Sequence, residues 1–372
     1  MQVTREQALA FRAARHGLGE RRDVPLAEAA AVPVSDFSRG AALLALAARS
    51  SAVTREGYAA AVDSAKLVVG FTLRGALHAV APGDVALFGP ALLSEDDQEL
   101  GAQLGQQVQR VCAEHALSPR AALDEVADAT RDALSTGSAL TKDELHAELR
   151  ERVRPEIQPW CKGCGSHHVA PMLWRYGGTV AGMRADAERR FLLDAAPDAP
   201  AADDALEAAR RFLRAYAPAT AADLAAWAGL AKPHARRLWD QLAPELVPVE
   251  SEARPRAKLF ALAGDAPALA DPPPARGVRL LPERDPFLQH PDRAWLTPDP
   301  DLRKRLHRPV AGPGAVLLDG TLAGLWRART KGKRLTIEIE PLTNKLDPNA
   351  LEPEAARVAT LRGVADHTLA IT

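Results

Sequence analysis

The sequence is poor in the features that mark secreted and membrane proteins. It has 3 cysteines in 372 residues, too few for the disulfide framework of a small extracellular protein. No apolar run approaches the roughly 18 residues of a membrane-spanning helix, and the opening residues MQVTREQ lack the apolar core of a signal peptide. We therefore expect a cytoplasmic protein with reduced thiols and no membrane partner.

The sequence also has little excess charge of either sign. Its 47 Lys and Arg residues nearly balance its 48 Asp and Glu residues, and the pI is near 6.8. This balance excludes a wholly basic, histone-like protein. It does not exclude nucleic-acid binding, because local patches of charge determine the field at a groove. With 47% hydrophobic residues, the chain is long enough for two or three domains with their own cores.

The stretch from Tyr216 to Leu262 has the pattern of a winged helix-turn-helix. A break at residues 217–219 separates a helix that ends near Tyr216 from a second helix, which opens at Thr220–Asp223 with a capping side chain. A third helix runs from about His234 to Leu242. It carries a group of basic residues away from its apolar face, namely Lys232, His234, Arg236 and Arg237.

Two short apolar runs follow this basic helix, at residues 246–249 and 258–262, and the turn between them contains Arg254 and Arg256. Helix, turn, basic helix and hairpin form the compact arrangement that places a helix in a DNA groove. The alternative is a helical core module used for protein contacts.

The same order of helices and hairpin can be laid along the chain twice more. The first copy has a capping box at Thr4–Gln7, helices at 41–49 and 54–65, and strands at 67–69 and 71–80. The second has helices starting at Pro119 and, after a capping box, at Thr141. Its third helix is expected to have Ser166 as its N-cap and to stop at Gly177-Gly178, before strands at 179–183 and 190–193 and a linker at Pro197–Pro200.

Beyond Leu262 the pattern changes. A Pro/Ala-rich linker is followed by strand-like runs at 278–282, 315–320, 322–329 and 334–341 and by a helix at 353–362. We therefore predict an α+β protein of three tandem winged helix-turn-helix units and a small β-rich C-terminal domain. The predicted boundaries are 1–117 for the first unit with a helical extension, 118–200 for the second, 201–270 for the third and 271–372 for the β-rich domain.

Five stretches, in this order along the chain, resemble those of a known family. They are Ala42–Arg49, Leu73–His78, Cys161–His168, Tyr216–Trp227, and Leu281-Pro282 with Asp285-Pro286-Phe287 followed by Leu317–Gly320. The family is that of the bacterial winged-helix DNA-binding proteins that include the AlkZ-like and YcaQ-like interstrand-crosslink DNA glycosylases. The resemblance implies a monomer whose three winged helices surround double-stranded DNA that is alkylated or crosslinked. It also implies a bacterial, nucleoid-associated protein.

The resemblance implies a catalytic Gln-x-Gln or Gln-x-Asp motif just before the helix at 41–49. Here that position holds Ser35, Asp36 and Phe37, without glutamine. Alkylation at N7 already makes a purine a good leaving group, so a polar residue needs only to position or deprotonate water. Asp36 and Ser35 are the candidate catalytic residues. The alternative is that Asp36, with Ser38, only caps the helix.

Further candidates for DNA contact lie outside the basic helix. Alternation along the first hairpin predicts that Arg74 and His78 share one face, and Ser166 as an N-cap would place His167 and His168 at a helix N-terminus, where phosphate can bind. The C-terminal hairpin has a basic tip, formed by Arg329, Lys331, Lys333 and Arg334.

Cys161 and Cys164 suggest a zinc site, but a typical site joins two ligand pairs separated by a dozen or more residues. All the ligands here would lie within eight residues, from Cys161 to His168. We therefore expect no metal and no other cofactor, with a site at Cys161 and Cys164 as the alternative.

Three functions remain open from the sequence. The first is a DNA glycosylase acting on N7-alkylated or crosslinked purines, with an altered catalytic motif. The second is a non-catalytic DNA-binding protein, such as a lesion sensor, an architectural protein or a transcriptional regulator. The third is a metal-linked protein-interaction scaffold. A regulator would be expected to dimerise on palindromic sites, which disfavours it for a monomer with three modules.

Overall fold

The computed structural model describes residues 1–193 and 200–372. The chain forms two compact units that are interleaved along the sequence. Unit 1 contains residues 1–58, 210–223 and 243–372, and unit 2 contains residues 59–209 and 224–242. The boundaries at residues 117, 200 and 270 between the expected winged-helix units and the C-terminal domain remain a prediction. The predicted linker at Pro197–Pro200 lies outside the described residues except for Pro200.

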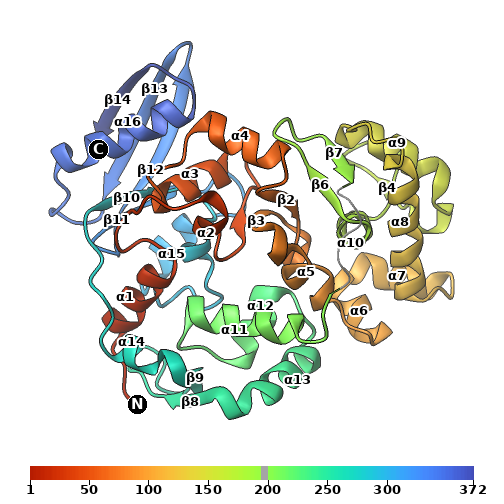
Figure 1. Ribbon diagram of the computed structural model, residues 1–372, viewed down its shortest axis with the longest axis horizontal. Coiled ribbons are helices and arrows are strands. Elements are labelled where there is room, and N and C mark those ends of the chain that lie inside the picture. Colours follow the sequence, from red (N-terminus) through yellow and green to blue (C-terminus); the bar gives the residue numbers. More distant parts are fainter. Residues whose placement is uncertain (194–199) are drawn as a thin grey trace. The chain divides into compact units, whose positions relative to one another are not determined.

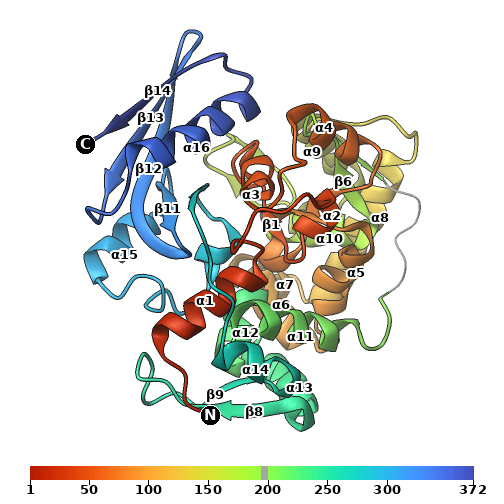
Figure 2. The same cartoon turned by 60° about the vertical axis from the view of Figure 1, so that its left-hand side comes forward.

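Unit 1 contains a five-stranded sheet in the order β10-β11-β12-β13-β14 (Figure 1). The strands are antiparallel except for the last pair, in which β14 runs parallel to β13. Figure 2 shows α16 lying along this sheet. The four predicted strands are confirmed, while β14 was not predicted. The bounds are β10 Val278–Leu281, β11 Gly314–Leu318, β12 Thr321–Lys331, β13 Arg334–Pro341, α16 Pro348–Leu361 and β14 Asp366–Ile371.

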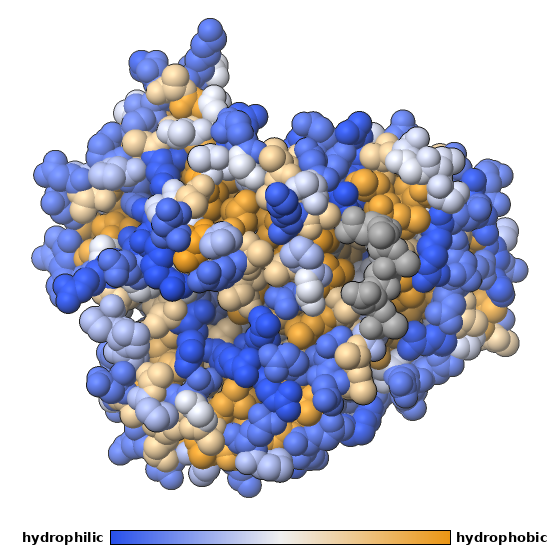
Figure 3. All heavy atoms as spheres, viewed as in Figure 1, coloured by the Kyte–Doolittle hydropathy of each residue, from blue (hydrophilic) through white to orange (hydrophobic). Residues whose placement is uncertain are grey.

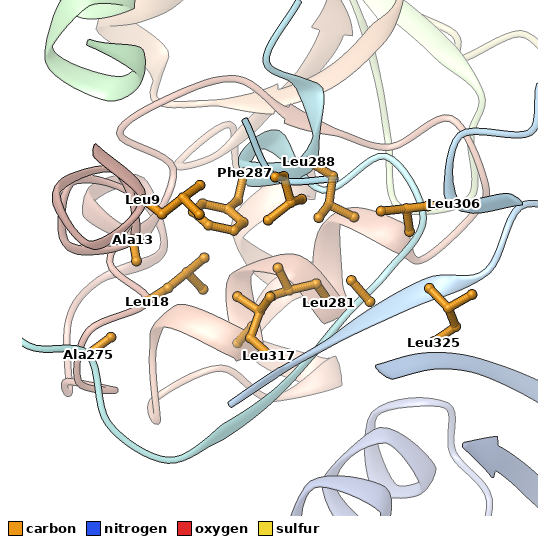
Figure 4. Close-up of a cluster of buried hydrophobic side chains, with 13 residues drawn as sticks. Leu9, Ala13, Leu18, Ala275, Leu281, Phe287, Leu288, Leu306, Leu317 and Leu325 are labelled. Atoms are coloured by element: carbon orange, nitrogen blue, oxygen red, sulfur yellow. The ribbon is translucent and has the colours of Figure 1, made fainter. Parts of the chain in front are cut away.

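A buried apolar cluster joins the N-terminal helix α1 (Arg5–Arg15) to this C-terminal part of the chain (Figure 4). Leu9 from α1 packs in the same cluster as Leu281 from β10, Leu317 from β11 and Phe287 from the loop between them. The predicted capping box of Thr4 and Gln7 is present at the start of α1. Residues more than 250 positions apart in the sequence therefore share one core.

Unit 2 is built on a sheet in which β3, β2, β6 and β7 are neighbours in that order, with helices α8, α9 and α10 (Figure 1). The helix starts predicted at Pro119 and Thr141 are confirmed, with Ser118 and Thr141 as the N-caps of α8 and α9. The bounds are β2 Val68–Phe71, β3 Leu77–Val80, α8 Pro119–Leu134, α9 Lys142–Arg152, α10 Pro171–Ala181, β6 Met183–Ala185 and β7 Phe191–Leu193.

Two predictions about α10 are wrong. Ser166 is not its N-cap, since Ser166 lies in a short strand and the helix begins at Pro171. The helix also continues through Gly177 and Gly178. A Cβ atom at Gly177 would lie 2.7 Å from Cγ1 of Val126 in α8, so this glycine allows two helices to approach closely instead of ending one.

The stretch from 216 to 262 forms the elements that its sequence predicts. Helix α11 ends at Tyr216, and the side chains of Thr220 and Asp223 cap the start of α12 by accepting each other's backbone N–H. Strands β8 and β9 then form an antiparallel pair. The bounds are α11 Asp204–Tyr216, α12 Ala221–Ala228, α13 Lys232–Leu242, β8 Leu246–Val249 and β9 Leu259–Leu262.

The remaining helices and strands are short. Among the described residues, none of the helices has both the length and the apolar character needed to cross a membrane. The bounds are α2 Leu26–Ala29, β1 Val34–Ser35, α3 Ala41–Arg49, α4 Arg55–Asp63, α5 Val85–Phe88, α6 Asp97–Leu104, α7 Gln106–Glu114, β4 Trp160–Cys161, β5 Ser166–His167, α14 Ala266–Ala270 and α15 Pro300–Leu306.

Candidate functional site

The segment that precedes α3 carries the candidate catalytic residues. Ser35 ends β1 and is partly buried, while Phe37 is 56% exposed. Asp36 lies between them and is 4% exposed. Its Oδ1 accepts a hydrogen bond from the backbone N–H of Ala42 at 3.1 Å, in the first turn of α3. The carboxylate thus satisfies a free donor at the positive end of the helix, which is the capping role considered above.

A buried ion pair holds a distant loop against α3. The guanidinium of Arg49 binds both carboxylate oxygens of Asp285 at 2.8 Å, and it also donates to the carbonyl of Ala45. Both charged side chains are almost fully buried. Asp285 also accepts the backbone N–H of Phe287. These bonds fix the loop after β10 beside the helix that follows Asp36.

The same loop contributes two functional candidates that the sequence did not indicate. The hydroxyl of Ser38 donates to Oε1 of Glu283 at 2.7 Å. The guanidinium of Arg284 lies 4.0 Å from the centre of the Phe37 ring, within the range of a cation–π contact. An exposed aromatic ring, a carboxylate and a guanidinium therefore meet near Asp36. The only sequence signal for this loop was the resemblance at Leu281-Pro282 and at Asp285–Phe287, on either side of these two residues.

The predicted shared face of Arg74 and His78 is wrong. Residues Leu73–Gly75 form a 3-10 turn between β2 and β3, so strand alternation does not apply to Arg74. Its guanidinium donates to the carbonyl of Trp227 at 2.9 Å, near the C-terminus of α12.

His78 is in β3 and is 4% exposed. Its Nδ1 lies 2.8 Å from the hydroxyl of Thr72. Burial lowers its pKa to about 3, and the nearby positive charge of Arg74 acts in the same direction. The imidazole is therefore neutral at pH 7. Its burial argues against a direct contact with DNA.

The cysteine-rich segment forms a small hairpin in unit 2. Strands β4 and β5 pair Trp160 with His167 and Cys161 with Ser166. Nδ1 of His167 lies 2.8 Å from the carbonyl of Gln158. Because residues 166–168 are not helical, His167 and His168 do not occupy the helix N-terminus at which phosphate contact was predicted.

Lys232, Arg236 and Arg237 of α13 are exposed, but the two arginines have carboxylate partners. Arg236 binds Asp240, one turn further along the helix. Arg237 binds both oxygens of Glu99 in a bidentate pair at 2.6 and 2.8 Å, and this bond holds the pKa of Glu99 at about 2. Of the other two basic residues, Lys232 is exposed and His234 is partly buried. Burial lowers the pKa of His234. The positive field of α13 is smaller than its sequence suggests.

The tip of the β12–β13 hairpin remains strongly basic. Lys331 and Arg334 are paired across the hairpin, and Lys333 lies in the turn between them. All three are exposed, and in the described part of the chain no carboxylate pairs with them. Arg329 is 73% exposed and contacts Glu338 at 3.2 Å. Figure 3 shows hydrophilic residues at the outermost point of this end of the sheet, with less polar residues behind them.

A cavity of about 280 Å³ lies at the C-terminal sheet of unit 1. It is lined by cations together with carboxylates and a tryptophan. The lining includes Arg305, Arg308, Arg327, Arg329, Trp326, Glu338 and Glu340. Arg305 is bound to Glu340, so part of this charge is internally neutralised.

Comparison with known proteins gives the same family along nearly the whole chain. Residues 32–361 match the family described as DNA glycosylase AlkZ-like. A protein of Streptomyces sahachiroi described as an interstrand DNA cross-link repair glycosylase is 29% identical, over 86% of each chain. The solved structure of Streptomyces sahachiroi DNA glycosylase AlkZ superposes with a TM-score of 0.76 at 25% identity, over the full length of both chains. The chain belongs to the AlkZ-like DNA glycosylase family.

Proposed function

We propose that this protein binds double-stranded DNA carrying N7-alkylated or crosslinked purines and excises the damaged base. The observation that carries the proposal is the similarity, over 86% of each chain, to an interstrand DNA cross-link repair glycosylase. Three winged-helix units with boundaries near residues 117, 200 and 270 would hold the duplex. The protein would act as a monomer in the bacterial cytoplasm, associated with the nucleoid.

The excision step would use the segment before α3. A purine alkylated at N7 is cationic, and its departure leaves positive charge on the sugar. Asp36 would stabilise that charge or accept a proton from the attacking water, and Ser35 would position the water. Glu283 and Arg284 lie beside this segment. They would contact the lesion or the strand that contains it.

A second function is favoured by the surroundings of Asp36. Its carboxylate is 4% exposed and its Oδ1 already accepts the N–H of Ala42, so α3 competes with water for that oxygen. A protein that uses Asp36 only as a cap would bind damaged DNA without cleaving the glycosidic bond. It would then serve as a lesion sensor, an architectural protein or a regulator.

An abasic-site assay separates the two functions. The protein is incubated with a duplex containing N7-alkylguanine, and strand breaks are counted after alkaline treatment. Asp36→Asn is the informative variant, because the amide oxygen can still cap α3 while the negative charge is lost. We expect Asp36→Asn to lose excision while keeping its folded structure and DNA binding. Asp36→Ala additionally loses the cap, at a cost of about 1 kcal/mol.

Ser35→Ala completes the set of variants and is expected to slow excision without affecting the cap. Failure of the unmodified protein to produce abasic sites, with salt-sensitive duplex binding intact, would contradict excision and favour the second function. Duplex affinity that does not change with salt concentration would contradict DNA binding itself, since phosphate contacts release counterions.

A further inference from the structure

The hairpin of unit 2 brings together three side chains that commonly bind transition metals. The sulfur atoms of Cys161 and Cys164 and a ring nitrogen of His168 all lie within 4.8 Å of one another. The sequence argued against a metal site because its ligands span only eight residues. The hairpin explains how so short a span suffices, since β5 folds back beside β4 and returns the chain to Cys161.

The backbone after Cys161 forms a tight turn. Strand β5 folds back beside β4, and the sulfur atoms of Cys161 and Cys164 lie within 4.8 Å of each other. The N–H of Gly165 donates to the carbonyl of Cys161 at 2.9 Å. Gly165 has φ of 61°, a conformation that favours glycine. The turn therefore closes tightly enough to bring the second cysteine beside the first sulfur.

The orientation of His168 is a second, independent observation. Its Nδ1 lies 2.8 Å from the carbonyl of Val169. A carbonyl can only accept, so Nδ1 carries the proton of the neutral ring and the lone pair lies on Nε2. Histidines that bind metals commonly donate their other ring N–H to a backbone carbonyl in this way, which fixes the tautomer and the ring orientation.

We propose that Cys161, Cys164 and His168 bind a zinc ion through two sulfur atoms and Nε2, with a water molecule in the fourth tetrahedral position. Two thiolates and an imidazole are the soft and intermediate ligands that suit Zn²⁺, whereas Mg²⁺ and Ca²⁺ require oxygen ligands. Zinc binding releases the thiol protons and involves no redox change. The proposal does not depend on the proposed function.

The metal would stabilise a segment with little apolar core of its own. Trp160 is 55% exposed and Lys162 is exposed, so few buried side chains support the turn. In small modules of this kind, metal binding supplies the folding free energy that the core lacks. His168 would be committed to the metal, and the exposed Trp160, Lys162 and His167 of this hairpin could still meet an external partner.

The zinc content of the purified protein tests the proposal directly. The purified, reduced full-length chain is stripped with a chelator, dialysed against Zn²⁺ and analysed by mass spectrometry of the metal. We expect about one zinc ion per chain. Titration with Co²⁺ should give the sulfur-to-cobalt charge-transfer band and the visible bands of a tetrahedral site. Cys161→Ser, Cys164→Ser and His168→Ala should each lose most of this signal.

Three variants serve as controls. Cys112→Ala removes the third thiol, which lies in α7, and His167→Ala removes the adjacent imidazole; both should keep the metal. His146→Ala should keep it as well. The ring of His146 lies 5.2 Å from that of His168, so loss of metal in this variant would overturn the assignment of the fourth position to water.

Equal zinc content and equal cobalt spectra in the unmodified chain and in the two cysteine variants would overturn the site. Because a variant can lose metal by unfolding, the unmodified protein provides a second readout. Its zinc X-ray absorption spectrum should show two sulfur ligands and at least one imidazole. A spectrum with oxygen and nitrogen ligands alone would contradict the proposal, whatever the variants do.

Discussion

The environment of His78 determines its charge. The side chain is buried against Thr72 and has a pKa of about 3, whereas an unfolded histidine has a pKa of about 6.5. Above pH 6.5 both states are neutral and the stability is fully present. As the pH falls below 6.5, the unfolded state gains a proton that the folded state does not bind, so the free energy of unfolding decreases.

His78→Gln tests this pH dependence. We expect the unmodified protein to lose about 1.4 kcal/mol per pH unit from this residue between pH 6 and pH 4. Glutamine keeps a hydrogen bond to Thr72 but cannot be protonated, so the variant should show a shallower decline. Urea unfolding at several pH values measures it, with the exposed His115→Gln as control. Parallel declines in both variants would exclude the assigned pKa.

Arg49 and Asp285 form the buried ion pair that positions the loop beside Asp36. Asp285→Ala leaves the arginine charge buried without its partner, and we expect a loss of about 3–5 kcal/mol in the free energy of unfolding. The double variant Arg49→Met with Asp285→Leu removes both charges and should recover much of this loss. Chemical unfolding of the three proteins gives the values. A double variant less stable than Asp285→Ala would contradict the burial argument.

At the level of helices and strands, the sequence analysis predicted the structure correctly wherever neighbouring residues determine it. The caps Thr4, Ser118 and Thr141 correctly mark the starts of three helices. The apolar alternation after residue 278 correctly predicts four strands. The predictions of helices and strands are wrong where contacts between residues distant in the sequence determine the structure. The sequence around Gly177 predicts the end of a helix. In the structure Gly177 lies within α10, where Val126 of α8 packs against it.

The candidate site was predictable only in part, for the same reason. Its local segment, Ser35–Phe37, was located from the order of the stretches. Glu283 and Arg284 reach this segment because of the ion pair to Asp285, a contact across more than 230 residues that no local pattern reports. His78 was misjudged because alternation assigns residues to the two faces of a strand, whereas all four residues of β3 are buried.

Gly177→Ala tests the close approach of α8 and α10. Alanine favours a helix by about 1 kcal/mol over glycine, but its Cβ would lie 2.7 Å from Cγ1 of Val126. We expect the clash to prevail, with a net loss of about 1–2 kcal/mol. In a Val126→Ala background the same change should cost less or stabilise the helix. Thermal unfolding of the four proteins measures the coupling, and additive effects would show that the clash is absent.

The basic tip of the β12–β13 hairpin makes a prediction about DNA affinity that rests on the proposed function. Replacing Lys331, Lys333 and Arg334 by alanine should weaken duplex binding. It should also reduce the slope of log affinity against log salt by up to about 3, because each phosphate that is no longer neutralised lowers the slope by about 0.9. Lys345→Ala, beyond the other end of β13, is the control. An unchanged slope would exclude the tip from the DNA interface.

At the level of the whole molecule, the chain crosses between two units four times, after residues 58, 209, 223 and 242. The sequence analysis predicted domains that follow one another along the chain. Hydrophobic periodicity indicates helices and strands, but it does not indicate which distant helices and strands share a core. A chain of residues 1–270 tests the predicted boundary. It lacks the strands that bury Leu9, so we expect exposed apolar surface and loss of cooperative unfolding in calorimetry. A stable, cooperatively unfolding product would support the consecutive division.

The shared core of α1 and the C-terminal sheet has a consequence for biosynthesis. The last residues of unit 2, which end at Leu242, are synthesised before β10 to β14 of unit 1. Leu9 and its neighbours are synthesised first and find their partners last. During translation the apolar face of the N-terminal helix therefore stays exposed until the C-terminal strands are made. A chaperone that binds short apolar helices would be expected to affect the yield of the folded protein.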